Sequence, residues 1–324
     1  MTNHIITKPR KSNMELLRLL AMLFILMLHS NYDGILKNYD GNSYTLETFF
    51  RFSVESIAIV GVNCFILISG YFGMKLKLRG VINLVFQTYF FALLALCVCF
   101  FIYGFYVPKA IVVRSLFPVT NYIWFLPCYL LLMLFSPILN KWLLASSLKH
   151  VFCITLCLYA VTFYWGLWGL NTGFGGYSFG HFVVMYVIGH MIRRYQECHQ
   201  TQHKYLYLSL YLGCVLALMV ISFLQFYYIP YFRSLLWSYN CPLIVVGSIG
   251  LFMFFACINM RANRIVNHCA KSCFAILLVH ISPCSTYVQW LRDISNTFSG
   301  VCMYNCDLLH FTHSPRPNQT ILLG

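Results

Sequence analysis

Long apolar stretches, nine by our reading, recur from Met14 to Trp290 with short polar segments between them. A helix needs about 20 apolar residues to cross the hydrocarbon core of a bilayer, because each residue adds about 1.5 Å. The chain is 60% hydrophobic and 9% charged, with a mean hydropathy of +0.72, whereas a soluble domain carries about 25% charged residues. The sequence therefore predicts an all-α fold, a polytopic integral membrane helical bundle.

Basic residues in the connecting segments orient this bundle, because loops rich in Lys and Arg stay in the cytoplasm. Alternate loops carry most of the Lys and Arg residues, and the N-terminal segment belongs to the basic set. We therefore predict a cytoplasmic N-terminus. The predicted spans are 14–30, 48–74, 81–106, 121–142, 150–170, 178–191, 204–228, 236–260 and 271–290.

The composition changes near residue 301. Residues 1–300 read as a single multi-span membrane domain, whereas residues 301–324 are too short and too polar for a further helix. We interpret residues 301–324 as an atypical tail, the product of a truncated or shifted reading frame. Re-sequencing the locus tests this interpretation.

The first apolar stretch carries two ionisable residues, Arg18 and His29, eleven positions apart. On a helix this spacing returns to within about 20° of the same face, about 16 Å further along the axis. Ionisable groups inside a bilayer are costly and usually face a bundle interior, so both are candidates for a functional site. Alternatively, Arg18 extends to the inner interface and His29 lies among the outer headgroups.

A candidate anion-binding site lies on the predicted cytoplasmic side. Arg18 is joined there by the end of the second span and by a basic loop, and Lys and Arg are natural partners of phosphate. A glycine in this region lets a ligand or another backbone approach closely. Alternatively, the basic loop residues only set the topology. The candidate substrate-binding residues here are Arg18, Ser69, Gly70, Lys75 and Arg79, with Lys77 beside them.

A second group of unusual residues lies on the predicted outer side. Glu55 is a carboxylate inside the second span, and we predict that it pairs with His29, because a buried carboxylate is costly without a partner. A histidine held by a carboxylate can act as a general base, so we predict catalytic roles for both. The alternative is a structural pair that joins two helices. Trp124 is a further candidate substrate-binding residue, and His181 is either part of this group or interfacial.

The remaining motifs point away from several function classes. The net charge of +14 is spread over helix ends and not clustered as a nucleic-acid surface requires, so we predict no nucleic-acid partner. Most of the 15 cysteines lie inside apolar stretches, where cysteine behaves as a small hydrophobe, and no metal-ligand spacing stands out. For His280, within the ninth predicted span, we expect a hydrogen bond between helices.

Four stretches occur in a characteristic order from Met14 to Trp290. They are ELLRLLAMLFILMLHS at 15–30, VNCFILISGYFG at 62–73, NYIWFLPCYLLLMLFSPIL at 121–139 and SCFAILLVHISP at 272–283. In order and spacing they resemble the membrane acyltransferase-3 family, many of whose members O-acetylate surface polysaccharides. That family usually has ten spans with both ends in the cytoplasm, so the predicted nine-span chain departs from it at the tail.

The resemblance implies an O-acyltransferase of the bacterial inner membrane that takes part in polysaccharide biosynthesis. It implies acetyl-CoA as the donor substrate, with no bound cofactor, and a surface glycan or lipid-linked sugar as the acceptor. The implied partners are therefore the lipid bilayer, acyl-CoA and that acceptor. The alternative function is a transporter or flippase for a lipid-linked sugar, which would use the same cavity without acyl chemistry.

Overall fold

The computed structural model of the chain describes residues 11–35, 46–103, 109–118, 124–167, 174–198, 203–228 and 236–281, all within one compact unit, Met1–Pro283. Over these residues the regular secondary structure is helical, with no strand. This confirms the predicted fold class, an all-α helical bundle with apolar helices. The tail at residues 301–324 lies outside the described residues, so its interpretation stays a prediction.

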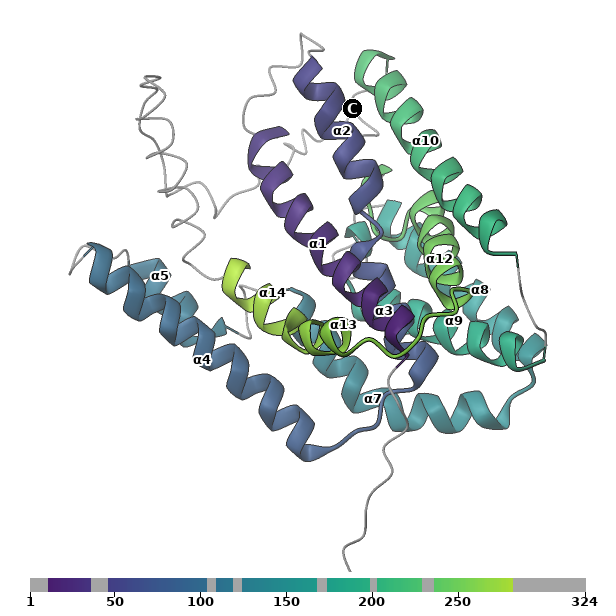
Figure 1. Ribbon diagram of the computed structural model, residues 1–324, viewed down its shortest axis with the longest axis horizontal. Helices are drawn as coiled ribbons and strands as arrows, with labels where there is room; N and C mark the ends of the chain where they lie inside the picture. The colour runs from purple at the N-terminus through teal and green to yellow at the C-terminus, as the bar shows by residue number, and fades with distance from the viewer. Residues whose placement is uncertain are drawn as a thin grey trace, which may run out of the picture. The chain divides into compact units, whose positions relative to one another are not determined.

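Each of the nine predicted spans contains a helix (Figure 1). Some boundaries differ from prediction: the long helix of the eighth stretch begins at Pro242, because proline suits the first turn of a helix, where its missing N–H is not needed. The long helices are α1 (Ser12–Ile35), α2 (Leu46–Ala58), α3 (Gly61–Phe72), α4 (Leu78–Tyr103), α7 (Phe125–Ala145), α8 (Leu148–Leu167), α9 (Phe179–Cys198), α10 (Lys204–Tyr228) and α12 (Pro242–Ala256). Shorter elements are α5 (Lys109–Leu116), η2 (Phe174–Gly176), α13 (Arg264–Cys269), η4 (Ala270–Ser272) and α14 (Cys273–Ile281).

Five described stretches are long and apolar enough to cross a membrane. They are Ser12–Asn31, Phe49–Phe72, Leu78–Phe101, Phe125–Ala145 and Lys204–Leu224. Two further helical stretches, Leu148–Tyr164 and Pro242–Ala256, are apolar but shorter. The ninth predicted span is described only as far as Ile281, and its remainder to Trp290 lies outside the described residues.

The second predicted span is two helices and not one. The α-helix is interrupted at Ile59 and Val60, where the sequence IAIVGV combines β-branched residues with a glycine, all weaker helix formers than alanine. The glycine at the start of α3 lies against α1: a Cβ atom at Gly61 would approach the Ala21 carbonyl oxygen to 2.9 Å. The interruption therefore occurs where α1 and α3 come close together.

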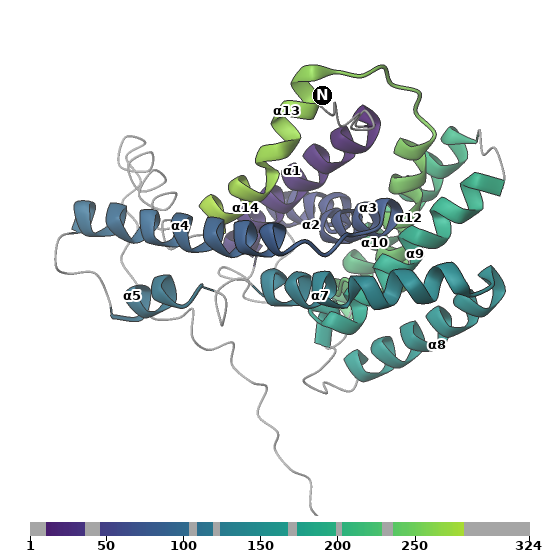
Figure 2. The same cartoon turned by 90° about the horizontal axis from the view of Figure 1, so that it is seen from below.

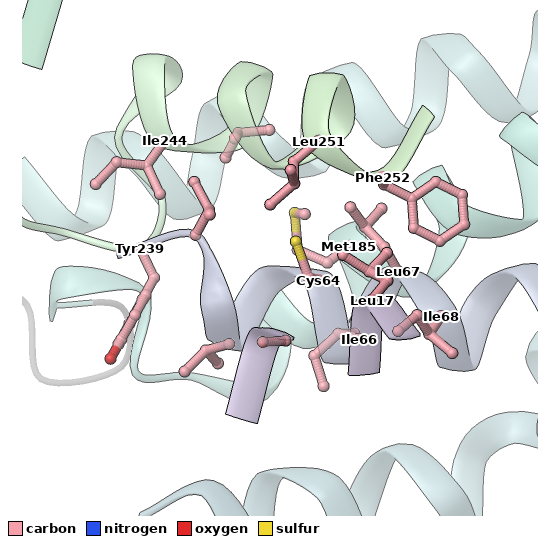
Figure 3. Close-up of a cluster of buried hydrophobic side chains, with 14 of the residues drawn as sticks. Leu17, Cys64, Ile66, Leu67, Ile68, Met185, Tyr239, Ile244, Leu251 and Phe252 are labelled. Atoms are coloured by element: carbon pink, nitrogen blue, oxygen red, sulfur yellow. The ribbon is translucent and has the colours of Figure 1, made fainter. Parts of the chain in front are cut away.

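Helix α3 is the central helix of the core. Its side chains Ile66, Leu67 and Ile68 are buried, the helix packs against α9, α1 and α12, and Figure 3 shows these residues in one cluster with Met185 and Phe252. The α3–α9 contact is close because two glycines face the opposite backbone. A Cβ atom at Gly70 would overlap the Tyr186 carbonyl, and one at Gly189 would overlap the Leu67 carbonyl.

Helix α14 brings the end of the described chain back to its beginning. It packs against α1 and α4, and Figures 1 and 2 both show α13 and α14 (yellow-green) beside α1 (purple). At the base of α1, Ser12 Oγ donates to Asn267 Oδ1 of α13 at 3.0 Å and accepts from Asn263 N at 2.8 Å. These bonds position α14 against the face of α1 that carries Arg18 and His29.

Candidate functional site

A cavity of about 430 Å³ lies between α1, α3, α14 and the beginning of α7. Aliphatic and aromatic side chains form most of its wall, as is typical of small-molecule sites. The predicted residues Arg18, His29, Ser69 and Trp124 all line it. Polar groups from elsewhere in the chain join them, namely Tyr129, Tyr239, Lys271 and Cys273.

Arg18 and His29 lie on the cavity side of α1, together with Met22 and Ile25 between them. Because both residues line the same cavity, they lie on one face of the helix, as their spacing predicts. The residues between them continue the same face because the helical repeat returns every three or four positions. One wall of the cavity therefore has a guanidinium near one end of α1 and an imidazole near the other.

Arg18 is held in place by the previous turn of α1. Its Nη1 atom donates to Oε2 of Glu15, whose side chain is 9% exposed while that of Arg18 is 27% exposed. A buried carboxylate that accepts a hydrogen bond from a guanidinium fixes the orientation of the guanidinium and of its N–H donors. Sequence reasoning did not select Glu15, although its i, i+3 spacing from Arg18 on a helix was a usable signal.

The His29 side chain contacts both its own helix, α1, and the neighbouring helix α14. Its Nδ1 atom is 2.7 Å from the Ile25 carbonyl oxygen and 3.2 Å from Nε2 of His280. The two imidazole rings meet edge to face, with centroids 4.8 Å apart. The expected hydrogen bond of His280 between helices is therefore present, and its partner is the predicted catalytic histidine.

Glu55 is not among the residues that line this cavity. Asn31 Nδ2 donates to Glu55 Oε2 at 3.0 Å and to the Arg51 carbonyl oxygen at 2.9 Å. The predicted partner of Glu55 was His29; within the described residues, its hydrogen bond comes from Asn31, two positions further along α1. Asparagine supplies an amide donor that joins α1 to α2, and this geometry favours the structural alternative for Glu55.

The basic loop between α3 and α4 is exposed and does not line the cavity. Lys75, Lys77 and Arg79 are exposed and are not among the residues that line the cavity, which agrees with the alternative in which they only set topology. The backbone just before them is fixed, because Met74 N donates to Tyr186 Oη at 2.9 Å and Asn140 Nδ2 donates to Met74 O at 2.8 Å. The second cation at the cavity is instead Lys271 of η4.

The end of α3 contributes one of its two predicted site residues. Ser69 lines the cavity; its hydroxyl donates to the Phe65 carbonyl at 3.0 Å and lies 3.3 Å from Tyr129 Oη. The neighbouring Gly70 faces the opposite way, toward the backbone of α9, because a helix turns by about 100° per residue. Gly70 therefore has a packing role: of the two possibilities considered for it, the close approach is that of another backbone and not of a ligand.

An aromatic wall surrounds Trp124. The indole stacks on Tyr239 with ring centroids 5.6 Å apart and meets Tyr177 edge-on at 4.4 Å. Trp124 and Tyr239 both line the cavity. Aromatic rings in such clusters give a rigid apolar surface with polar edges.

His181 is buried, with 1% of its surface exposed, so its side chain packs inside the bundle. Its Nε2 atom lies 2.9 Å from Asn63 Oδ1, and Asn63 Nδ2 donates to the Tyr239 carbonyl at 2.9 Å. These two hydrogen bonds join His181 of α9 to Asn63 of α3 and Asn63 to Tyr239, as buried polar groups usually are joined. Sequence reasoning missed Asn63, which holds the cavity wall at Tyr239.

No cluster of three or more metal-ligating side chains occurs among the described residues. A family model described as an acyltransferase domain matches residues 11–305. No curated protein and no solved structure matches the chain.

Proposed function

The chain belongs to this acyltransferase family, and from that premise we propose that it transfers acetyl groups from acetyl-CoA to hydroxyls of an envelope polysaccharide or lipid-linked sugar. The observation that carries the proposal is one cavity with cations at one end of the α1 face and a histidine at the other. The chemistry needs both, because the donor is an anionic thioester and the acceptor is a neutral hydroxyl.

The cationic end of the cavity suits the phosphates of the donor. Arg18 presents a planar guanidinium whose remaining N–H groups can bind phosphate oxygens, and Lys271 adds a second positive charge. The carboxylate of Glu15 offsets the charge of Arg18, so the net positive charge at this end of the cavity comes from Lys271. We assign donor binding to Arg18 and Lys271, with Ser69 at the cavity wall between α3 and α7.

The histidine end suits the acceptor hydroxyl. Nδ1 of His29 is hydrogen-bonded to the Ile25 carbonyl oxygen, which can only accept. In the neutral ring, Nδ1 therefore carries the proton and Nε2 carries the lone pair. Such an imidazole can take the hydroxyl proton near neutral pH. Trp124 and Tyr239 line the same cavity and offer an aromatic surface for the apolar face of a sugar ring.

The separation of the two ends agrees with the shape of the donor. Arg18 and His29 are about 16 Å apart along α1, too far to serve one hydrogen-bonded step. In CoA, an extended pantetheine arm separates the phosphates from the sulfur. With its phosphates at Arg18 and its arm along the apolar wall, acetyl-CoA would present its thioester toward His29.

The orientation follows the charge bias of the loops. A cytoplasmic N-terminus places Arg18 and Lys271 on the side that supplies CoA and His29 toward the opposite side, where an envelope glycan is built. We therefore propose the bacterial inner membrane as its location, with the glycan entering from outside.

The decisive experiment uses membranes that contain the wild-type chain or His29→Ala. Incubated with acetyl-CoA and envelope polysaccharide freed of its esters by mild alkali, wild-type membranes should form acetyl esters and release CoA thiol. His29→Ala should lower the rate by about 10²–10⁴, the usual contribution of a general base, at equal protein level in the membrane. A transporter without acyl chemistry would release no CoA thiol above membranes lacking the protein, and that result would refute the proposal.

A further inference from the structure

Two histidines from opposite ends of the described chain meet beside the cavity. His280 Nε2, from α14, lies 3.2 Å from His29 Nδ1, from α1. The rings are inclined at 74° to each other, so the edge of one faces the other. The contact involves Nδ1 of His29, and Nε2 is the other nitrogen of that ring.

Two backbone carbonyls determine where the protons lie. Nδ1 of His280 is 3.0 Å from the Ile276 carbonyl oxygen, and Nδ1 of His29 is 2.7 Å from that of Ile25. Because a carbonyl oxygen accepts and cannot donate, each neutral ring carries its proton on Nδ1. His280 therefore holds its lone pair on Nε2, the atom that faces the Nδ1–H of His29.

We propose that His280 is a positioning residue for His29. Nε2 of His280 and the Ile25 carbonyl oxygen share the hydrogen bond donated by Nδ1–H of His29. This contact keeps the lone pair of His29 on Nε2 and stabilises the imidazolium that forms when His29 takes a proton. A hydrogen-bond acceptor behind a catalytic imidazole fixes both its tautomer and its orientation. The inference rests on the proposed acyl transfer and adds to it a residue from the far end of the chain.

The reaction balances with these groups alone. Nε2 of His29 takes the proton of the acceptor hydroxyl while that oxygen forms a bond to the acyl carbonyl carbon. The carbon–sulfur bond of the thioester then breaks, its electron pair goes to sulfur, and His29 returns the proton to the thiolate. Between these steps both ring nitrogens of His29 carry protons, and the Ile25 carbonyl and His280 Nε2 remain as acceptors for Nδ1–H.

The test compares His280→Gln with His280→Met in the full chain in membranes. Both side chains have similar length, but only glutamine supplies an oxygen acceptor near the position of Nε2. With acetyl-CoA and alkali-treated envelope polysaccharide, we expect His280→Met to lower kcat at least about tenfold, within the range of general-base effects. We expect the KM for acetyl-CoA to be unchanged, and His280→Gln to recover most of the rate.

A structural role alone would make the two variants equally impaired or equally active, and either result would overturn the proposal. A second measurement does not depend on any variant of His280. The ¹⁵N shifts of the His29 ring, identified as the signals lost in His29→Ala, should show Nδ1 protonated and Nε2 unprotonated in the resting protein. The opposite tautomer would refute the role of His280 even if acyl transfer is confirmed, whereas absence of transfer by the wild type would refute the proposed function itself.

Discussion

At the scale of single residues, the charges beside the cavity depend on neighbours that lie far away in the sequence. Lys271 lines the same cavity as Arg18, and the hydrogen bond from Cys273 Sγ to the Arg18 carbonyl, at 3.8 Å, joins the two segments. Lys77 is also basic and lies in the predicted cytoplasmic loop, but it is exposed and does not line the cavity. Lys271 is therefore the lysine to which we assign donor binding, and Lys77 is a basic residue outside the cavity with which it can be compared.

Replacing Lys271 with Met should raise the KM for acetyl-CoA about tenfold or more and leave kcat nearly unchanged. A hydrogen bond to a charged group contributes about 1.5–3 kcal/mol, and about 1.4 kcal/mol corresponds to a tenfold change in affinity. Steady-state rates over a range of acetyl-CoA concentrations measure both constants. Lys77→Met is the matched control and should change neither; equal KM values for the two variants would show that Lys271 does not bind the donor.

At the scale of the elements, the α3–α9 contact fixes the position of Ser69 at the cavity. Gly70, the next residue, lies against the Tyr186 backbone, and the hydroxyl of Tyr186 donates to Asn140 Oδ1 at 2.6 Å. The backbone of α9 cannot move aside easily, because the residues around this contact are buried. Glycine at position 70 is therefore required for packing, and its effect on the site is indirect.

Gly70→Ala should lower the melting temperature of the detergent-solubilised protein, because overpacking a tight contact typically costs about 1–3 kcal/mol. Gly80→Ala is the control, since a Cβ atom at Gly80 would meet no heavy atom within 4 Å. In a helix that control should be neutral or slightly stabilising, as alanine is a better helix former by about 1 kcal/mol. If the two variants melted at the same temperature, the close contact between α3 and α9 would not limit stability.

At the scale of the whole molecule, orientation decides which substrate meets which end of the cavity. The loop charges predict that the turn at Asn171 faces outward and the loop at Gln200 faces the cytoplasm; both positions lie outside the described residues. A membrane-impermeant thiol reagent applied from outside should therefore label Asn171→Cys and not Gln200→Cys. Cys198 is replaced in both variants so that it contributes no label. The reverse labelling pattern would invert the assignment of donor and acceptor sides.

The sequence by itself determined the helical membrane fold, the family, and the common face of Arg18 and His29. These depend on composition, on local order and on the helical repeat, which act over one or two turns of chain. The mild interruption before Gly61 was also local, but it was not visible within an otherwise continuous apolar stretch.

Only the tertiary structure decided which residues accompany Arg18 and His29. Folding places Lys271 and His280 beside α1 and directs Gly70 toward α9. It also makes Asn31, and not His29, the hydrogen-bond donor to Glu55. An apolar helix without a distinct polar face can pack in many rotations, and its partners are selected by close fit and by a few interhelical hydrogen bonds. Those contacts join segments far apart in the chain, so spacing along the sequence does not contain them.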